Sequence, residues 1–267
     1  MSDSASHKAR PLADLRARLS GQGAAAPGQV RPVDLSVRRG GPHDLRLARG
    51  RVHEIRPDRP GHGAAAGFAA RCLAGTQRGD TRPVLWVASP RDRAEQGRLY
   101  LPGLVQAGLV GTRLLTATPR RAKDVLWVLE EALASGALAG VAAWVGELGL
   151  TPSRRLALAA ESQGTPLFLL RPWADQAATS VETRWRVGPL PSAPNLYDPQ
   201  APGQAVWQLT REKARQGPPA TWEVVCNGPK DALDLAAHAG DRTLAARVGP
   251  DDPFPDDRQT HRHARAG

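Results

Sequence analysis

Residues 52–78 follow the order of a phosphate-binding loop: a short apolar strand, a Pro/Gly loop and an apolar helix. In a working loop of this kind, Gly-Lys-Ser/Thr opens the helix, because the lysine contacts the phosphates and the hydroxyl binds Mg²⁺. Here the corresponding residues are Gly61, His62, Gly63 and Ala64. Both reactive side chains are missing, so we expect no bound cofactor.

The missing lysine removes most of the affinity that a nucleotide would have. A lysine about 4 Å from a phosphate charge is worth roughly 4 kcal/mol at an effective dielectric of about 20. Each ~1.4 kcal/mol is a tenfold change in affinity, and a histidine is largely neutral at pH 7. Two interpretations of the loop remain: a vestigial nucleotide site at Gly61, His62 and Gly63, or a tight strand-to-helix turn built from glycine. We favour the turn.

The elements around this loop alternate between strands and helices. Apolar runs predict buried strands at 52–55, 84–88, 113–117, 141–145 and 167–170. Segments with helical periodicity or helix-start residues predict helices at 64–73, 99–109, 119–135 and 153–163. Buried strands that alternate with helices favour a mostly parallel sheet with helices on both faces.

The pattern changes after about residue 180, where apolar and polar residues alternate. This period of two, at 181–187, 205–210 and 222–226, is typical of half-exposed antiparallel strands. We therefore predict one α/β domain over residues 32–226, with an antiparallel C-terminal edge to its sheet.

The two ends of the chain differ from this domain. Residues 1–31 predict an N-terminal helical arm followed by a Gly/Ala/Pro linker. Residues 227–267 predict a largely disordered tail, with at most one or two helical turns at 231–238. His261 and His263 lie in this tail without a cluster of further ligands, so we expect no metal site.

The chain is basic, with 36 Lys and Arg against 26 Asp and Glu and a net charge of +10. Neighbouring arginines that could contact nucleic acid are Arg38, Arg39, Arg46, Arg49 and Arg51. A second interpretation is a GC-rich genome that favours arginine codons, since only four of the 36 basic residues are lysine. The sequence leaves both interpretations open.

The bulk composition predicts a cytoplasmic protein. No run approaches the 18 or so apolar residues of a membrane span, and the polar N-terminus does not resemble a signal peptide. Cys72 and Cys226 lie far apart in the sequence, which favours free thiols over a disulfide framework.

Over about residues 45–226, the ordered segments resemble the ImuA family, which is related to the RecA recombinase core and to the SulA division inhibitor. The segments that carry the resemblance are the strand at 52–55, the stretch 97–104 with 108–109, the helices at 124–138 and 150–161, and the strand at 183–187. The resemblance implies a RecA-like core.

The RecA pattern also places a glutamate after the second strand, where it orients the attacking water, and an aspartate at the end of the fourth. Here the second strand runs into Ala88, Ser89 and Pro90, and the fourth ends near Glu147. Neither position carries the expected carboxylate, and we expect Glu147 to be a solvated strand-end residue.

The resemblance implies a damage-inducible role in error-prone DNA repair, with an ImuB-type polymerase-like protein and an error-prone polymerase as partners. We expect a non-catalytic RecA-like adaptor of a translesion synthesis mutasome in the SOS response. One alternative is a weak nucleotide-dependent ATPase associated with DNA. Another is a SulA-like inhibitor that sequesters a polymerising protein.

Overall fold

The computed structural model describes residues 33–34, 45–60, 63–175, 177–195, 197–198, 200–215, 217–226 and 233–238. The predicted arm at 1–31, the candidate residues Arg38, Arg39, Gly61 and His62, and the tail histidines lie outside these ranges.

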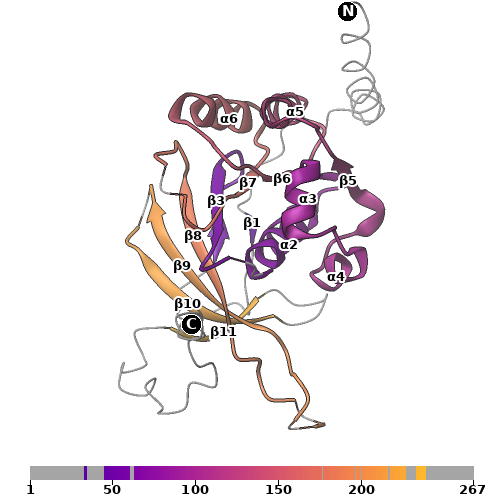
Figure 1. Ribbon diagram of the computed structural model, residues 1–267, viewed down its shortest axis with the longest axis vertical. Helices are drawn as coiled ribbons and strands as arrows, with labels where there is room; N and C mark the ends of the chain where they lie inside the picture. The colour runs from indigo at the N-terminus through magenta and orange to yellow at the C-terminus, as the bar shows by residue number, and fades with distance from the viewer. Residues whose placement is uncertain are drawn as a thin grey trace, which may run out of the picture.

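Short strands and helices follow one another in the predicted alternation (Figure 1). The strands are β1 (Val33–Asp34), β2 (Arg46–Leu47), β3 (Val52–Pro57), β4 (Val84–Val87), β5 (Leu114–Ala117), β6 (Gly140–Trp144), β7 (Leu167–Leu170), β8 (Thr183–Leu190), β9 (Val206–Ala214), β10 (Ala220–Cys226) and β11 (Leu233–His238). The helices are α2 (Ala64–Gln77), α3 (Pro90–Gln96), α4 (Leu101–Gln106), the 3₁₀ turn η1 (Gly111–Arg113), α5 (Ala122–Ala134) and α6 (Leu150–Gln163).

One large sheet runs through the described part of the chain, with the strand order β11-β10-β9-β8-β3-β7-β6-β4-β5. The strands from β8 to β5 in this order pair in parallel. The pairs β8–β9, β9–β10 and β10–β11 are antiparallel. The predicted fold class is confirmed as an α/β fold with a mostly parallel sheet and an antiparallel C-terminal edge; the likeness to the RecA core stays a prediction.

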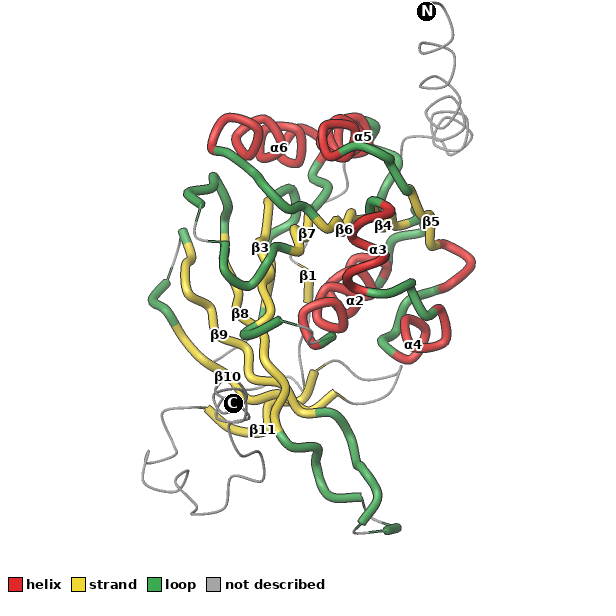
Figure 2. Tube along the Cα trace, viewed as in Figure 1, coloured by secondary structure: helices red, strands yellow, loops and turns green. Residues whose placement is uncertain are grey.

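Helices cover both faces of the parallel part of the sheet, as Figure 2 shows, with α2 and α4 on one side and α5 and α6 on the other. The α2 side packs into one apolar core with Phe68, Leu73 and Trp86. The α5/α6 side packs into a second core with Leu129, Leu133 and Leu156. All six residues of β3 are buried as a result, the two charged ones included.

Alanine and glycine bring α2 close to the sheet. Most of its residues are buried, and Ala65, Ala69 and Ala70 are at most 1% exposed. A Cβ added at Gly67 would lie 2.8 Å from the Trp207 ring of β9, so only glycine fits without a shift. The small side chains are therefore explained by close packing of the helix against the sheet.

A neutral histidine links β3 to β8 on the α2 side. The buried His53 places Nδ1 2.8 Å from Thr183 Oγ1 and Nε2 2.8 Å from the Ala48 carbonyl oxygen. Because that carbonyl can only accept, Nε2 carries the proton, and the Thr183 hydroxyl donates to Nδ1 while accepting from Trp185 Nε1 at 2.7 Å. Burial lowers the pKa of His53 from its ordinary 6.5 to about 4.

One expectation for the C-terminal segment is wrong. Residues 233–238, placed in a largely disordered tail with helical turns, form the strand β11. Antiparallel pairing with β10 accounts for the difference, because a strand's hydrogen-bond partners lie elsewhere in the chain and leave a weak local signal. Within the described ranges, no helix combines the length and apolar character needed to cross a membrane.

Candidate functional site

Where α2 begins, the junction that could have held a phosphate offers no charged or hydroxyl side chain at its described residues, Gly63 and Ala64. After β3, the chain turns through Asp58, and α2 begins at Ala64 with Gly63 as its N-cap. No side chain caps this helix end, and no acidic residue lies in its first turn. The described start of α2 therefore presents backbone N–H groups alone, which attract anions only weakly. The charged residues just after β3, Asp58 and Arg59, lie 3.4 Å apart as an ion pair.

Gly63 itself is not required by the turn. Its φ of −71° is one that any residue adopts, and a Cβ added there would meet no atom within 4 Å. The glycine-turn interpretation therefore does not hold at this residue, whereas the close approach at Gly67 does require glycine.

The residues after β4 and β6, where the RecA pattern has catalytic carboxylates, have other roles here. Ser89, after β4, is the N-cap of α3, and the Asp92 carboxylate accepts from Ser89 N at 2.8 Å and from Ser89 Oγ at 2.6 Å. The nearest carboxylate therefore belongs to a capping box, which stabilises the helix start. Glu147, after β6, is exposed, as expected for a solvated carboxylate.

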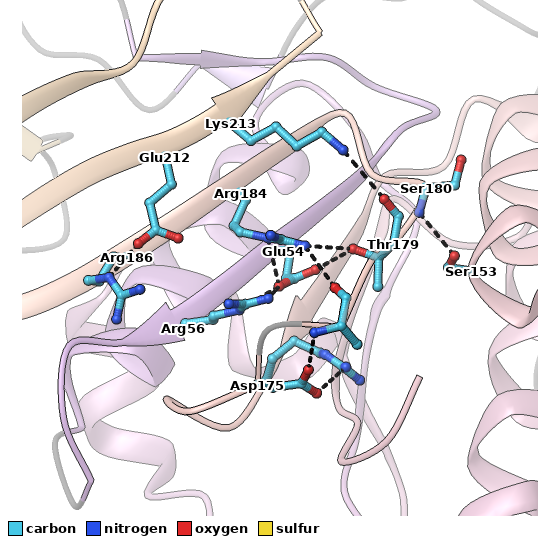
Figure 3. A network of polar contacts seen from close by, with 12 residues as sticks. Glu54, Arg56, Ser153, Asp175, Thr179, Ser180, Arg184, Arg186, Glu212 and Lys213 are labelled. Carbon is cyan, nitrogen blue, oxygen red and sulfur yellow. Dashed lines mark hydrogen bonds and ion pairs between the residues drawn. The ribbon is translucent and has the colours of Figure 1, made fainter. Parts of the chain in front are cut away.

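A buried charged cluster lies instead on the α5/α6 side of β3 and β8 (Figure 3). Glu54 Oε1 accepts from Arg56 Nε at 2.6 Å and lies 3.1 Å from Arg184 Nε. Its other oxygen, Oε2, accepts from the Thr179 hydroxyl at 2.7 Å. With both oxygens engaged, Glu54 is not free to act as a base or a metal ligand.

The loop after β7 encloses this cluster. Arg171 donates from Nη1 to the Val145 carbonyl at 3.1 Å and pairs through Nη2 with Asp175. Burial lowers the pKa of Arg171, and the charges of Asp175 and Glu54 oppose that shift. Lys213 of β9 reaches the Thr179 carbonyl at 3.5 Å, so the loop is tied to the sheet from two sides.

The charged cluster has a structural role in the described arrangement, in which its charges are paired with one another. Three guanidinium groups face two carboxylates, and the side chains of Glu54, Arg56 and Arg171 are wholly buried. The excess positive charge would suit an anion, but Glu54, Arg56 and Arg171 offer it no exposed side-chain surface. Charges buried this deeply are tolerated because they are paired and hydrogen-bonded.

The structure accounts separately for the three candidate arginines that it describes. Arg49 donates to the Thr76 carbonyl at 2.9 Å and lies 3.4 Å from Asp80. Arg51 pairs with Glu161 at 2.8 Å. Arg46 is exposed on β2. Arg49 and Arg51 therefore hold carboxylates of their own chain, which reduces the charge that they offer to an outside anion.

Sequence reasoning missed the charged cluster because its members are far apart in the chain. Thr179 and Glu54 are separated by 125 residues. One signal was available: Glu54 and Arg56 lie two apart on a strand predicted to be buried, so both point to the same face. Charged residues on such a face need partners, and Arg184 on the next parallel strand has the matching alternation.

No group of three or more His, Cys, Asp or Glu side chains that could hold a metal ion occurs within the described ranges. The two cysteines are free thiols, with Cys72 buried and Cys226 half-buried. Burial raises the pKa of Cys226 to about 12, so its thiol is protonated and unreactive at neutral pH.

The strand order and the two helical layers define an α/β protein, and its sequence lacks the lysine and hydroxyl of a phosphate-binding loop. No protein-family model matches the chain. It is 31% identical over 169 residues to Protein ImuA of Caulobacter vibrioides, in both strain NA1000 / CB15N and strain ATCC 19089 / CIP 103742 / CB 15.

That match covers 60% of the chain and 66% of each relative, slightly less than two thirds of the relative's length. The chain belongs to the ImuA family. The family is associated with SOS mutagenesis, as the sequence resemblance implied.

Proposed function

We propose that the protein is a non-catalytic RecA-like adaptor in SOS-induced error-prone DNA synthesis, acting in the cytoplasm. Its partners in this proposal are an ImuB-type polymerase-like protein and an error-prone polymerase. The observation that carries the proposal is the start of α2, where Gly63 and Ala64 bring no side-chain charge or hydroxyl to a nucleotide. Family membership supplies the pathway.

The remaining carboxylates add support, because none of those near the strand ends is arranged for phosphoryl transfer. Asp92 is held in a capping box, and both oxygens of Glu54 are engaged. Catalysis of phosphoryl transfer depends on positioned cations and a group that orients the nucleophile. A protein that keeps the packing of the core without these groups is suited to displaying surfaces.

The test is co-purification of the full chain with the ImuB-type protein encoded in the same genome, followed by size-exclusion chromatography. We expect one complex that also retains the error-prone polymerase. Separate elution of all three proteins, at concentrations well above the micromolar range, would overturn the adaptor proposal.

A weak nucleotide-dependent ATPase is the second candidate, because the N-terminus of α2 has no side-chain cap and its N–H groups are free for an anion. Titration with ATP and Mg²⁺, followed by tryptophan fluorescence, separates the two. We expect no saturable change in the micromolar range. A saturable, Mg²⁺-dependent signal would favour the ATPase instead.

Contact between a basic face and DNA is a further part of the proposal, and the described candidates for it are Arg46, Arg49 and Arg51. Phosphate contacts release counterions, so the affinity must fall as salt rises. Fluorescence anisotropy with labelled single-stranded DNA measures this dependence. An affinity that does not change with salt would remove DNA from the list of partners.

A further inference from the structure

An exposed apolar surface lies on the segment that connects β4 to β5. Five of the nine large hydrophobic residues that are exposed in the described part of the chain come from this one segment. We call them the α4 patch: Leu99, Tyr100, Leu101, Val105 and Val110. Scattered exposed apolar residues are ordinary, whereas a contiguous group marks a contact surface.

Leu101 and Val105 of the α4 patch are close in space as well as in sequence. A Cβ added at Gly111 would lie 3.3 Å from Leu101 Cδ1 and 3.4 Å from Val105 Cγ2. One at Gly103 would lie 3.1 Å from Tyr100 Cδ1. The two glycines therefore leave room for these side chains to lie against the backbone.

Buried residues and hydrogen bonds of the same segment fix the position of the α4 patch. Leu104 and Leu109 are buried in the core on the α2 side. The amide oxygen of Gln77, at the end of α2, accepts from Val110 N at 2.8 Å, and the Leu109 N–H donates to the Leu104 carbonyl at 3.1 Å. A preorganised surface binds a partner with less loss of conformational entropy.

The charges around the α4 patch indicate what it would bind. The two carboxylates of the segment 90–113 are both occupied, Asp92 in the capping box and Glu95 with Arg91 at 2.8 Å. Arg93 and Arg98 are exposed and hold no carboxylate among the described residues. The charge left for a partner is therefore positive.

We propose that the α4 patch is the docking site for a partner segment that carries apolar side chains flanked by carboxylates. The proposal rests on the adaptor function and assigns this segment to the ImuB-type partner. Tyr100 is 72% exposed and Leu101 is 49% exposed, so these two residues lose the most water-accessible surface on binding. Tyrosine is among the residues most often found as interface anchors.

The first experiment compares the wild-type protein with a Tyr100→Ala/Leu101→Ser variant in binding to the ImuB-type protein by biolayer interferometry. Loss of two central anchors is expected to weaken binding about 30-fold or more, the scale of an interface hot spot. Leu158→Ser is the matched control, since Leu158 is 68% exposed on α6 and outside the α4 patch. The control should bind as the wild type does.

The outcomes separate the two proposals. If the wild type and the patch variant bind the ImuB-type protein equally well, the docking site is wrong and the adaptor function stands. If the wild type does not bind that protein, the adaptor function fails. Thermal unfolding of each variant checks the fold, and unchanged midpoints are expected because the replaced side chains are exposed.

A second probe tests the patch chemistry without the ImuB-type protein. It is a fluorescein-labelled helical peptide with leucine on one face and glutamate on the other. We expect saturable binding to the wild type that is lost in the patch variant and falls roughly fivefold with Arg98→Glu, the scale of one exposed ion pair. Arg154→Glu, an exposed arginine on α6, is the matched charge control.

No binding of this peptide to the wild type would overturn the proposal. Equal binding of a peptide with lysine in place of glutamate would do so as well, because the patch would then select only for apolar surface.

Discussion

On their α2 side, β3 and β8 contribute Ile55 and Trp185 to an apolar core, and Trp185 packs on Phe68 and Trp222 at centroid distances of 5.7 and 5.5 Å. On the opposite side, the alternate residues Glu54 and Arg184 meet in a charged cluster. Both sides are buried, and both belong to the same two strands.

The difference shows that burial alone does not dictate an apolar face. On the α2 side, a helix of small residues seals the sheet. On the other side, α6 contacts β3, and β8 is reached by the loop after β7, whose polar groups need partners. Charged residues serve that loop because they bond both to its hydroxyls and to its carbonyls.

The largest effect is expected from Glu54→Ala. The change leaves the buried Arg56 and the partly buried Arg184 without their shared counter-charge, and removing one partner of a buried ion pair costs roughly 3–5 kcal/mol. Urea unfolding followed by tryptophan fluorescence measures the loss. Glu161→Ala is the control, since Glu161 is half-exposed and its loss should cost less than about 1 kcal/mol. Equal losses would mean that the cluster contributes no more than a surface pair.

Acid is expected to destabilise the α2 side through His53. Its pKa is about 4 in the folded protein and 6.5 when unfolded, so the unfolded chain takes up a proton first as the pH falls. The contribution of His53 to the free energy of unfolding is therefore fully present above pH 6.5 and is lost as the pH falls towards 4. At about 1.36 kcal/mol per pKa unit, the loss is roughly 3 kcal/mol.

The measurement is a series of urea unfolding curves between pH 7 and 4 for the wild type and His53→Gln. The variant lacks the titrating group, so the difference between the two proteins should shrink as the pH falls. A constant difference across this range would show that His53 does not titrate there.

Gly67→Ala tests whether the α2 side is limited by space. The added methyl group would lie 2.8 Å from the Trp207 ring. Overpacking costs about 1–3 kcal/mol, and alanine regains up to ~1 kcal/mol in a helix, so we expect a net loss of roughly 1–2 kcal/mol by thermal unfolding.

Gly146→Ala is the matched control for that change, because a Cβ at Gly146 meets nothing within 4 Å. Adding Trp207→Leu to Gly67→Ala should restore part of the lost stability, because the smaller leucine makes room for the alanine methyl group. A stabilised Gly67→Ala protein would show that the indole moves aside freely.

The smallest effect is expected from Arg51→Ala, at the open rim of the charged side. Arg51 is about a third exposed and pairs with Glu161 at 2.8 Å. Exposed pairs contribute about 0–1 kcal/mol and are screened by salt. Thermal unfolding of the wild type and Arg51→Ala should differ only at low salt. A larger loss of stability that does not depend on salt would show that this ion pair contributes as much as the buried cluster.

Much of the fold followed from periodicity in the sequence. The buried strands β3, β4, β6 and β7 lie within a few residues of their predicted positions, because uninterrupted apolar runs are a local signal. Helix starts were less accurate. The helix predicted at 119–135 begins at Ala122, and the helix predicted at 153–163 begins at Leu150.

The candidate site was less predictable, since it depends on pairing across the sheet. The absence of a lysine and a hydroxyl from the loop sequence could be recognised from the sequence. The role of Glu54 could not, because its partners Thr179 and Arg184 become neighbours only when β3 pairs with β8. The α4 patch was missed for a related reason: exposure depends on what the fold leaves uncovered.

The pairing of β3 has a consequence for synthesis on the ribosome. Its two neighbours in the sheet, β7 and β8, come more than a hundred residues later, and His53 meets Thr183 across 130 residues. Until β7 and β8 emerge, the backbone of β3 has no partner strand on either side. Unpaired strands invite association between chains, and contacts this distant in sequence form slowly. A nascent chain that stops short of β8 would therefore be a natural substrate for a chaperone.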